Sequence, residues 1–336
     1  MNILIIGVTG LLGSEAAEQL RLKGHKIRGL ALPPLPKGLN LSPEIEVFFG
    51  NYITGDDELF NKIFTDIDAF IFAAGIDERI EVPAPALEVF NKYNVDPLKR
   101  LFHFAKAHGV KHSVILGSYF THFVKTRPEL HLTKHHPYIQ SRQLQKELAL
   151  SQASDNFSVA LLELPYIFGT QPGRKPVWVF LVKMLKKMKG ATFFPRGGTA
   201  IVTVRQVGQA ICGALTQTSG GVAYPLGYYN LTWKELFTLF HKYMGVPKKP
   251  IITIPNWLFK IAANNIKKKQ KKDGFEGGLD LPEFTKMQCS KQFIDANLAA
   301  ISLGVKEDNL EQAIAASVQQ SVNAMNKSND YIEMKI

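Results

Sequence analysis

The chain has 336 residues, of which 46% are hydrophobic and 21% charged, and this is enough to bury a core of one or two domains. Its 22 Phe, 10 Tyr and 3 Trp exclude a disordered or fibrous protein. Two cysteines, Cys212 and Cys289, exclude a disulfide scaffold and a zinc site built on several thiolates. The net charge of +11 indicates an anionic partner and leaves open a nucleic acid, a phosphate-bearing cofactor or a membrane surface.

The N-terminus carries no recognisable targeting segment. Met1 and Asn2 lead directly into an apolar run at 3–6, without the basic region and cleavage site of a signal peptide. No run of about 18 apolar residues occurs, so we expect no transmembrane helix and no integral contact with a membrane. We therefore expect a cytoplasmic protein.

Short apolar runs alternate with amphipathic stretches through the first half of the chain. Gly24 ends the first helix, and prolines at 33, 34 and 36 mark a loop. The alternation predicts an α/β fold, a Rossmann-type doubly wound parallel sheet with helices on both faces, whose ligands bind beyond the C-terminal strand ends. The strands are predicted at 3–6, 26–32, 46–49, 69–73, 112–116 and 158–164, and the helices at 14–23, 96–108 and 138–149.

The pattern changes after Pro165. Helices are predicted at 177–189, 206–214, 233–244 and 310–325, joined by irregular segments. We predict a smaller, mixed α/β C-terminal lobe. The expected domains are therefore a dinucleotide-binding domain at 1–165, to which a segment around 200–215 returns, and a substrate lobe that makes up most of 166–336.

A glycine-rich motif follows the first strand and opens the first helix. Gly7 permits a tight turn, Gly10 lets the backbone approach a pyrophosphate, and Gly13 lets the helix pack close to the strand. The helix N-terminus offers free N–H groups and a partial positive charge to the phosphates. The motif reads Gly7-Val8-Thr9-Gly10-Leu11-Leu12-Gly13.

This spacing resembles the extended short-chain dehydrogenase/reductase family, which includes the NAD-dependent epimerases and dehydratases. Further similar segments are Phe72-Ala73-Ala74-Gly75 beside the cofactor, Asn94-Val95 at a helix start, 112–118, Leu164-Pro165-Tyr166-Ile167-Phe168-Gly169, 231–236 and 293–304. The resemblance implies that the cofactor is held by Gly7, Thr9, Gly10, Leu11, Leu12, Gly13, Asn51, Ala73, Ala74, Gly75 and Pro165.

The resemblance leaves NAD and NADP open as cofactors. An acidic residue at the end of strand two would favour NAD, but Ala31 and Leu32 occupy those positions. Asn51 replaces the family's aspartate and can still hydrogen-bond an adenine edge. Because no carboxylate repels a 2′-phosphate here and Lys37 or Arg28 could approach one, we slightly favour NADP.

The family's catalytic residues map onto Ser118, Tyr138 and residue 142. In the family, the tyrosine moves a proton, the serine orients the substrate oxygen, and a lysine four residues after the tyrosine lowers its pKa and holds the nicotinamide ribose. Here that lysine is Arg142. An arginine keeps the charge that stabilises a tyrosinate but releases no proton, so both a slow enzyme and a fold without turnover are consistent with this site.

Several other polar clusters invite a functional interpretation. His131, His135 and His136 precede Tyr138 but lack matching carboxylate or thiolate ligands, so we expect no metal. In the segment that resembles the family's "HVDDVA", Arg205 and Gln206 replace the acidic pair, which weighs against a sugar nucleotide. Three cations of the second lobe are equally consistent with phosphate or carboxylate binding and with surface charge, namely Arg174, Lys175 and Arg196.

A basic amphipathic segment covers 256–272. It fits either a helix lying on an anionic membrane or, as we favour, a helix whose apolar face covers the substrate pocket and whose lysine end is solvated. Gly274, Gly277 and Gly278 then predict a mobile loop that could act as a lid.

We therefore predict an NAD(P)-dependent oxidoreductase that transfers hydride to or from a small carbonyl or alcohol substrate. The alternatives are a nucleotide-sugar epimerase or dehydratase, and a non-catalytic NAD(P)-binding sensor. No nucleic-acid partner is expected, because the lysine clusters at 183–189 and 267–272 lack interleaved aromatic residues. The resemblance leaves a homodimer open, since the family often pairs through helices of the Rossmann domain.

Overall fold

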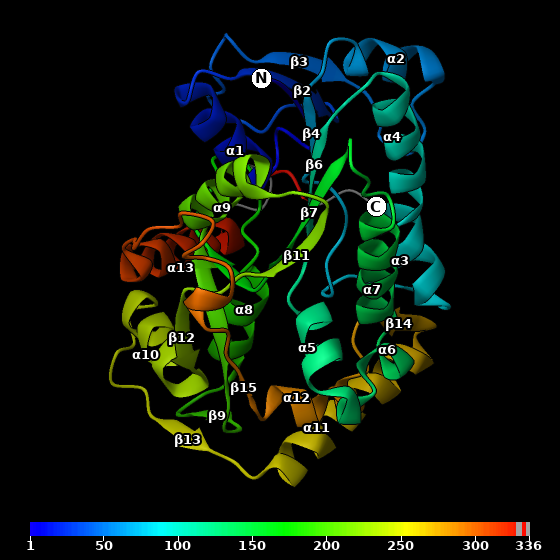
Figure 1. Cartoon of the computed structure of the whole chain (residues 1–336). Helices are drawn as coiled ribbons and strands as arrows, with labels where there is room; N and C mark the ends of the chain where they lie inside the picture. Colours follow the sequence, from blue (N-terminus) through cyan, green and yellow to red (C-terminus); the bar gives the residue numbers. More distant parts are fainter. Residues whose placement is uncertain (327–330, 334–336) are drawn as a thin grey trace.

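The computed structural model describes residues 1–326 and 331–333. Its centre is a seven-stranded parallel sheet with the order β11-β7-β6-β4-β1-β2-β3 (Figure 1). The predicted doubly wound sheet is thus confirmed, with an edge strand, β11, that the sequence did not predict. The strands are β1 (Asn2–Ile6), β2 (Lys26–Ala31), β3 (Glu46–Phe49), β4 (Ala69–Phe72), β6 (His112–Ser118), β7 (Ser158–Leu164) and β11 (Gly221–Pro225).

Helices cover both faces of this sheet. Alternate residues of β1 face opposite ways: Ile3 and Ile5 join one buried cluster, and Leu4 and Ile6 join the other. This explains why the strands are continuously apolar. One face packs on α1 (Leu11–Leu22) and α9 (Val204–Gln217), and the other on α2 (Asp57–Phe64), α4 (Asp96–Ala107) and α7 (Pro137–Leu150).

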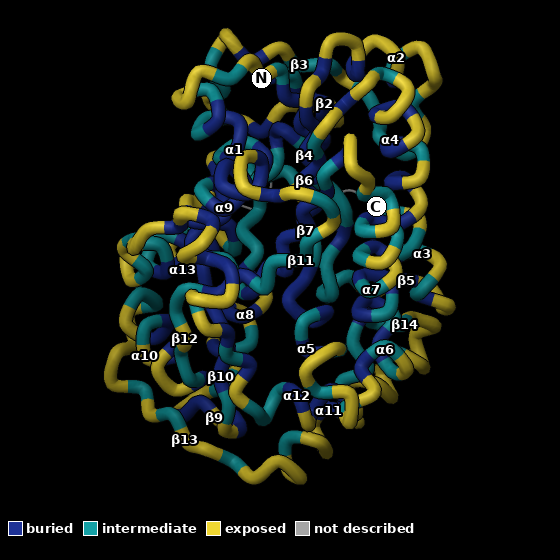
Figure 2. Tube along the Cα trace, in the orientation of Figure 1, coloured by how far each residue is buried: buried dark blue, intermediate teal, exposed yellow. Residues whose placement is uncertain are grey.

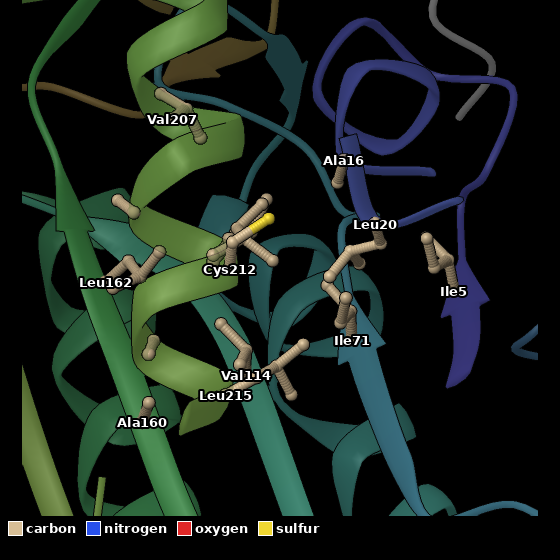
Figure 3. Close-up of a cluster of buried hydrophobic side chains, with 14 of the residues drawn as sticks. Ile5, Ala16, Leu20, Ile71, Val114, Ala160, Leu162, Val207, Cys212 and Leu215 are labelled. Atoms are coloured by element: carbon tan, nitrogen blue, oxygen red, sulfur yellow. The ribbon is translucent and has the colours of Figure 1, made fainter. Parts of the chain in front are cut away.

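The cluster under α1 and α9 contains one of the two cysteines. Figure 3 shows Cys212 on α9 among apolar side chains that include Leu162, Val207 and Leu215. Burial raises the pKa of the Cys212 thiol. The residue therefore acts as a small apolar core side chain.

The strand order reverses between β1 and β4. β1 pairs with β2 on one side and with β4 on the other, so the loops that follow β1 and β4 leave the sheet in opposite directions. Gly7 N donates to the Leu30 carbonyl and Ala73 N to the Ile6 carbonyl, both at 2.9 Å. The glycine motif therefore lies at the topological switch point, where open α/β sheets bind ligands.

The second lobe packs around an aromatic cluster that includes Phe168, Trp178, Phe237 and Phe240. Its mixed character agrees with the expectation from sequence. Its strands are β8 (Tyr166–Phe168), β9 (Thr192–Phe194), β10 (Gly198–Thr203), β12 (Tyr229–Thr232), β13 (Ile251–Thr253) and β15 (Lys291–Gln292), and its helices are α8 (Val179–Lys187), α10 (Trp233–Tyr243) and α13 (Leu310–Asn326).

A third group of elements packs around a buried cluster that includes Phe90, Phe120 and Phe284.

The glycine-rich segment that was predicted to be a mobile loop is partly a strand, β14 (Phe275–Gly277), which pairs antiparallel with β5 (Glu81–Pro83). No helix of the described residues is both long and apolar enough for a bilayer span. The remaining helices are α3 (Ala86–Asn94), α5 (Phe120–Thr126), α6 (Leu132–His135), α11 (Asn256–Lys272) and α12 (Leu281–Gln288), with 3-10 turns at Pro128–Leu130 and Ala296–Leu298.

Helix α11 contradicts the expectation that its apolar face covers the substrate pocket. Ala263 is its one buried residue. Phe259 is half-buried and packs on Phe194, with ring centroids 5.4 Å apart, while Trp257 and Ile261 are exposed. Figure 2 shows the segment that leads from β13 toward α11 as largely exposed. The apolar side chains of this helix therefore point mainly to solvent.

Candidate functional site

A cleft of about 520 Å³ opens at the switch point of the sheet. The glycine motif forms its floor, and residues from the loops after β2, β4 and β8 form its walls. Of the residues predicted to hold the cofactor, those lining this cleft are Gly7, Thr9, Gly10, Leu11, Ala73, Ala74 and Gly75.

The glycines of the motif are needed for close packing. Gly7 has a φ of +89°, and a Cβ there would lie 2.7 Å from the Ala73 carbonyl oxygen. A Cβ on Gly13 would lie 2.2 Å from the Gly7 carbonyl oxygen. Side chains at these positions would push the helix away from the strand.

The start of α1 suits the pyrophosphate of a dinucleotide. Gly10 caps the helix without a side-chain hydrogen bond, and the first turn contains no acidic residue. The N–H groups of Leu11 and Leu12 lie in that first turn, where an α-helix supplies no internal acceptor. These donors and the helix dipole make the residues of the cleft fit a phosphate-bearing cofactor.

Three other predicted cofactor residues lie behind the cleft wall. Leu12 packs into the apolar cluster under α1. The Asn51 side-chain oxygen accepts from Ile53 N at 2.8 Å, and its neighbours Gly50 and Tyr52 line the cleft instead. Pro165 is buried between β7 and β8.

The cations proposed for a 2′-phosphate lie elsewhere. Arg28 forms an ion pair with Glu46 and donates to the Thr65 carbonyl, so its guanidinium is committed away from the cleft. Lys37 is exposed and is not among the described residues that line the cleft. The suggestion of Arg28 as a phosphate ligand is therefore wrong, because Arg28 lies within β2 and not in the loop that follows its C-terminal end.

Arg174, from the second lobe, lies at the glycine motif. Its Nη2 donates to the Thr9 carbonyl at 3.1 Å and its Nε to the Gln171 side-chain oxygen at 3.0 Å. Gln171 in turn donates to the Thr9 carbonyl at 2.9 Å. Burial lowers the pKa of Arg174, which lines the cleft together with Lys175 and Lys183. The sequence indicated this cation but not its place beside the cofactor loop.

Tyr138, the predicted proton donor, and Ser118, predicted to orient the substrate oxygen, lie close together. Ser118 ends β6 and Tyr138 begins α7, and both are buried. Burial raises the pKa of Tyr138, while the charge of Arg142 and a hydrogen bond with Ser118 lower it in part. The net shift is upward, so the phenol is protonated at neutral pH.

Arg142 lies one helical turn after Tyr138 and faces the same way. Its guanidinium carbon is 5.1 Å from the Tyr138 ring centroid. Its Nη1 donates to the Gln145 side chain at 2.9 Å and its Nη2 to the Ile76 carbonyl at 3.0 Å. Ile76 lines the cleft, so Arg142 is held directly behind the cleft wall.

Aromatic rings surround Tyr138 and continue into the second lobe. Consecutive rings pack edge to face or tilted, with centroids 4.6–6.3 Å apart. This geometry is favourable for aromatic pairs. The row runs through Phe90, Tyr138, Phe120, Tyr119, Tyr166 and Trp178.

Sequence reasoning missed a charged triplet that follows β4. Burial and the charge of Asp77 raise the pKa of Glu78 to about 7, against the pull of Arg79. Arg79 is bound to Asp77 and donates to the Val177 carbonyl at 2.7 Å. The charge of Glu78 also acts on Tyr138. The position of this triplet just after a parallel strand could have revealed it.

The histidines before Tyr138 differ in environment. His136 is buried, and its Nδ1 accepts from Asp280 N at 3.1 Å. Burial lowers the pKa of His136 to about 4. The described residues contain no group of three or more His, Cys, Asp or Glu that could hold a metal.

Arg196, the third cation suggested for the substrate lobe, is exposed.

Solved structures with the same fold have low sequence identity to this chain. The protein gox2253 shares 19% identity with a TM-score of 0.72, covering 98% of this chain and 99% of the other. A UDP-glucuronic acid 4-epimerase from Bacillus cereus, in complex with UDP-glucuronic acid and NAD, shares 12% with a TM-score of 0.68, covering 96% and 99%. A nucleoside-diphosphate-sugar epimerase from Pseudomonas aeruginosa shares 14% with a TM-score of 0.66, covering 99% of both chains.

The family is established at the level of sequence. No curated protein matches the chain closely enough to count as a relative. Residues 3–222, which include the glycine motif, Tyr138 and Arg142, match the NAD dependent epimerase/dehydratase family. The chain therefore belongs to the NAD dependent epimerase/dehydratase family.

Proposed function

We propose that this protein is an NAD(P)H-dependent reductase of a small, largely apolar carbonyl compound. The observation that carries the proposal is the protonated Tyr138 phenol, close to Ser118 and beside the Arg142 guanidinium, which is anchored to Ile76 in the wall of a dinucleotide cleft. A protonated tyrosine is ready to act as an acid, which is what carbonyl reduction needs.

The reaction divides into one cofactor step and several protein steps. When bound, the reduced nicotinamide supplies a hydride. Ser118 orients the substrate oxygen, and Tyr138 donates its proton to that oxygen as negative charge develops there. Arg142 stabilises the resulting tyrosinate by its fixed charge. Because an arginine holds its own proton, Tyr138 recovers a proton from water or from another group.

The surroundings of Tyr138 favour an apolar substrate over a sugar nucleotide. Phe120 and Tyr119 are buried around Tyr138, and the partly buried Tyr166 packs against Tyr119, so the surroundings of the phenol are apolar. A nucleotide diphosphate needs cations with free donors. Arg79, the guanidinium that lines this part of the cleft, is bound to Asp77 and to a backbone carbonyl.

We further propose NADP as the preferred cofactor, with Arg174 as the residue that binds the 2′-phosphate. Arg174 contacts the carbonyl of Thr9, and the neighbouring Gly173 lies against Lys37 in the loop after β2. The adenosine ribose of a Rossmann-bound dinucleotide lies at the end of strand two. The guanidinium therefore comes from the second lobe to the loop after β2, whose own Lys37 is not among the described residues that line the cleft.

The cofactor proposal is tested by titrating NADPH and NADH into wild type and Arg174→Gln. Loss of a charge-assisted hydrogen bond should weaken NADPH binding by about 10- to 100-fold and NADH binding much less. Lys37→Gln is the matched control and should leave the ratio unchanged. Tighter binding of NADH than NADPH by wild type would refute the preference.

The reductase proposal is tested by oxidation of NAD(P)H with a panel of aliphatic and aromatic aldehydes and ketones. Tyr138→Phe should lower turnover by about 10²–10⁴-fold. Tyr243→Phe changes a half-buried tyrosine of the second lobe whose hydroxyl donates to Glu311, and this control should retain full activity. Cofactor binding without oxidation by any carbonyl would count against the proposal.

A second candidate is a nucleotide-sugar epimerase, because the Bacillus cereus and Pseudomonas aeruginosa proteins with this fold are epimerases. Such an enzyme would purify with tightly bound NAD and show no net consumption of cofactor. The third candidate, a cofactor-binding sensor, is favoured by the engagement of Arg142 with Ile76 and Gln145. A sensor would bind cofactor, and Tyr138→Phe would leave its activity in cells unchanged.

A further inference from the structure

One end of the molecule, formed by β9, β13 and α11, exposes five large apolar side chains. β9 and β13 pair in register, so that Phe193 and Ile252 are direct neighbours, exposed by 46% and 44%. Helix α11 follows β13 and exposes Trp257 by 65%, Leu258 by 40% and Ile261 by 50%. In Figure 1 these elements form the lower end of the molecule, opposite β3 and α2. We call these five side chains the apolar end.

The inner face of α11 is fixed by its contacts. Ala263 is buried, Phe259 packs on Phe194, and Lys267 pairs with Asp280. With about 3.6 residues per turn, these three positions lie on one side of the helix. The outward side is therefore the opposite one.

The outward side changes character along the helix. Trp257 and Ile261 occupy it in the first turns, and Lys268 and Lys272 continue the same stripe in the last turns. All four are exposed. The helix thus presents an apolar start and a cationic end on one surface, which is the pattern of a helix that enters a lipid interface at an angle.

The positive charge of the chain is concentrated in the stretch of sequence that ends with α11, and this helix itself carries six lysines. Between residues 164 and 272 the sequence has eighteen Lys and Arg but one acidic residue, Glu235. The whole chain has a net charge of +11, so the remaining residues together are acidic. Lys189 and Lys248 add charge in the loops that precede β9 and β13.

We propose that the apolar end and the lysines of α11 dock this protein peripherally on an anionic lipid surface. Tryptophan is favoured where one part of a side chain is apolar and the surroundings are wet. Lysines beside it are attracted to acidic headgroups, and neither element alone gives stable attachment. A nucleic acid would bind the lysines but not Trp257 and Ile261. An apolar protein partner would bind Trp257 and Ile261 but not the lysines. The proposal does not depend on the reaction proposed above.

The test is sedimentation of the full chain with vesicles. We expect it to pellet with vesicles of phosphatidylcholine containing about one third phosphatidylserine, and to stay in solution with phosphatidylcholine alone. Binding should fall strongly between about 0.1 and 0.5 M salt, because screening weakens headgroup attraction. Absence of binding to the anionic vesicles overturns the proposal.

Two double variants separate the contributions. Trp257→Ser with Ile261→Ser, and Lys268→Glu with Lys272→Glu, should each lower the vesicle-bound fraction at least tenfold. Because all four side chains are exposed, thermal unfolding should be unchanged, which excludes misfolding as the cause. If the serine variant binds vesicles as wild type does, the attraction is charge alone and the proposal is wrong.

Matched controls use exposed residues elsewhere. Leu298→Ser with Ile301→Ser removes apolar side chains exposed by 54% and 51% in the segment that packs near α9. Lys23→Glu with Lys125→Glu makes the same change of charge on other surfaces. Both variants should bind anionic vesicles like wild type. Equal losses in controls and test variants would mean that the charge and apolarity of the whole surface, not α11, decide binding, and would overturn the assignment.

Discussion

The guanidinium of Arg142 lies 5.1 Å from the ring of Tyr138 while donating to the carbonyl of Ile76. The cation therefore serves the tyrosine electrostatically and is at the same time anchored to the wall of the cofactor cleft. Its orientation is fixed by the Ile76 carbonyl and the Gln145 side chain.

Arg142 should contribute to stability as well as to the site. Arg142→Met removes charge-assisted hydrogen bonds to Ile76 and Gln145, and we expect a loss of about 2–3 kcal/mol in the free energy of unfolding. Arg142→Lys keeps the charge but lacks the planar guanidinium that reaches both acceptors. Its free energy of unfolding should therefore fall by less, about 1 kcal/mol. Denaturant unfolding measures both. Glu147→Gln, at an exposed position of the same helix, should change stability by less than about 0.5 kcal/mol.

The two glycines Gly7 and Gly24 form a matched pair. Both have positive φ, +89° and +83°, but a Cβ at Gly7 would meet the Ala73 carbonyl at 2.7 Å, whereas nothing lies within 4 Å at Gly24. Gly24→Ala should therefore cost only backbone strain, about 1 kcal/mol, and leave dinucleotide binding intact. Gly7→Ala should cost more and abolish binding. Calorimetric titration with NADPH and NADH measures the affinity of each variant. Equal affinities of Gly7→Ala and Gly24→Ala would contradict the prediction.

His136 should make the fold sensitive to acid. Its pKa falls from 6.5 to about 4 on folding, so the unfolded chain binds the proton more readily. Stability is fully present above pH 6.5 and is lost as the pH falls towards 4, by up to about 3 kcal/mol. His136→Asn keeps an acceptor for Asp280 N but does not titrate, so its unfolding free energy should decline less between pH 7 and pH 4.5. Parallel curves for the two proteins would refute this.

Glu78 should have the opposite dependence. Its pKa rises from 4.5 to about 7 on folding, so the folded chain holds the proton more tightly. The stabilisation is present below pH 4.5 and is lost as the pH rises through 7, by up to about 3 kcal/mol. Glu78→Gln should remove this loss, and Glu88→Gln, on the exposed side of α3, should not. Urea unfolding at a series of pH values measures how the free energy of unfolding changes with pH.

The local pattern of residues predicted the sheet well. The buried strand β7 and the partly exposed edge strand β3 were both predicted with their observed bounds, because each is a short apolar run. The prediction missed β11, because this edge strand is half-buried and lies in the half of the chain dominated by helices. The division near residue 165 remains a prediction, and β11 and α9 both pack with the first lobe's sheet.

The sequence by itself determined the fold class, the glycine motif and the pairing of Tyr138 with residue 142, because each depends on neighbours in the chain or on a repeated spacing. Only the tertiary structure decided what those residues contact. Arg174 reaches Thr9 across 165 positions, and the apolar start of α11 faces solvent. Periodicity tells which side chains share a face, but not what covers that face, since that depends on packing between segments far apart in the chain.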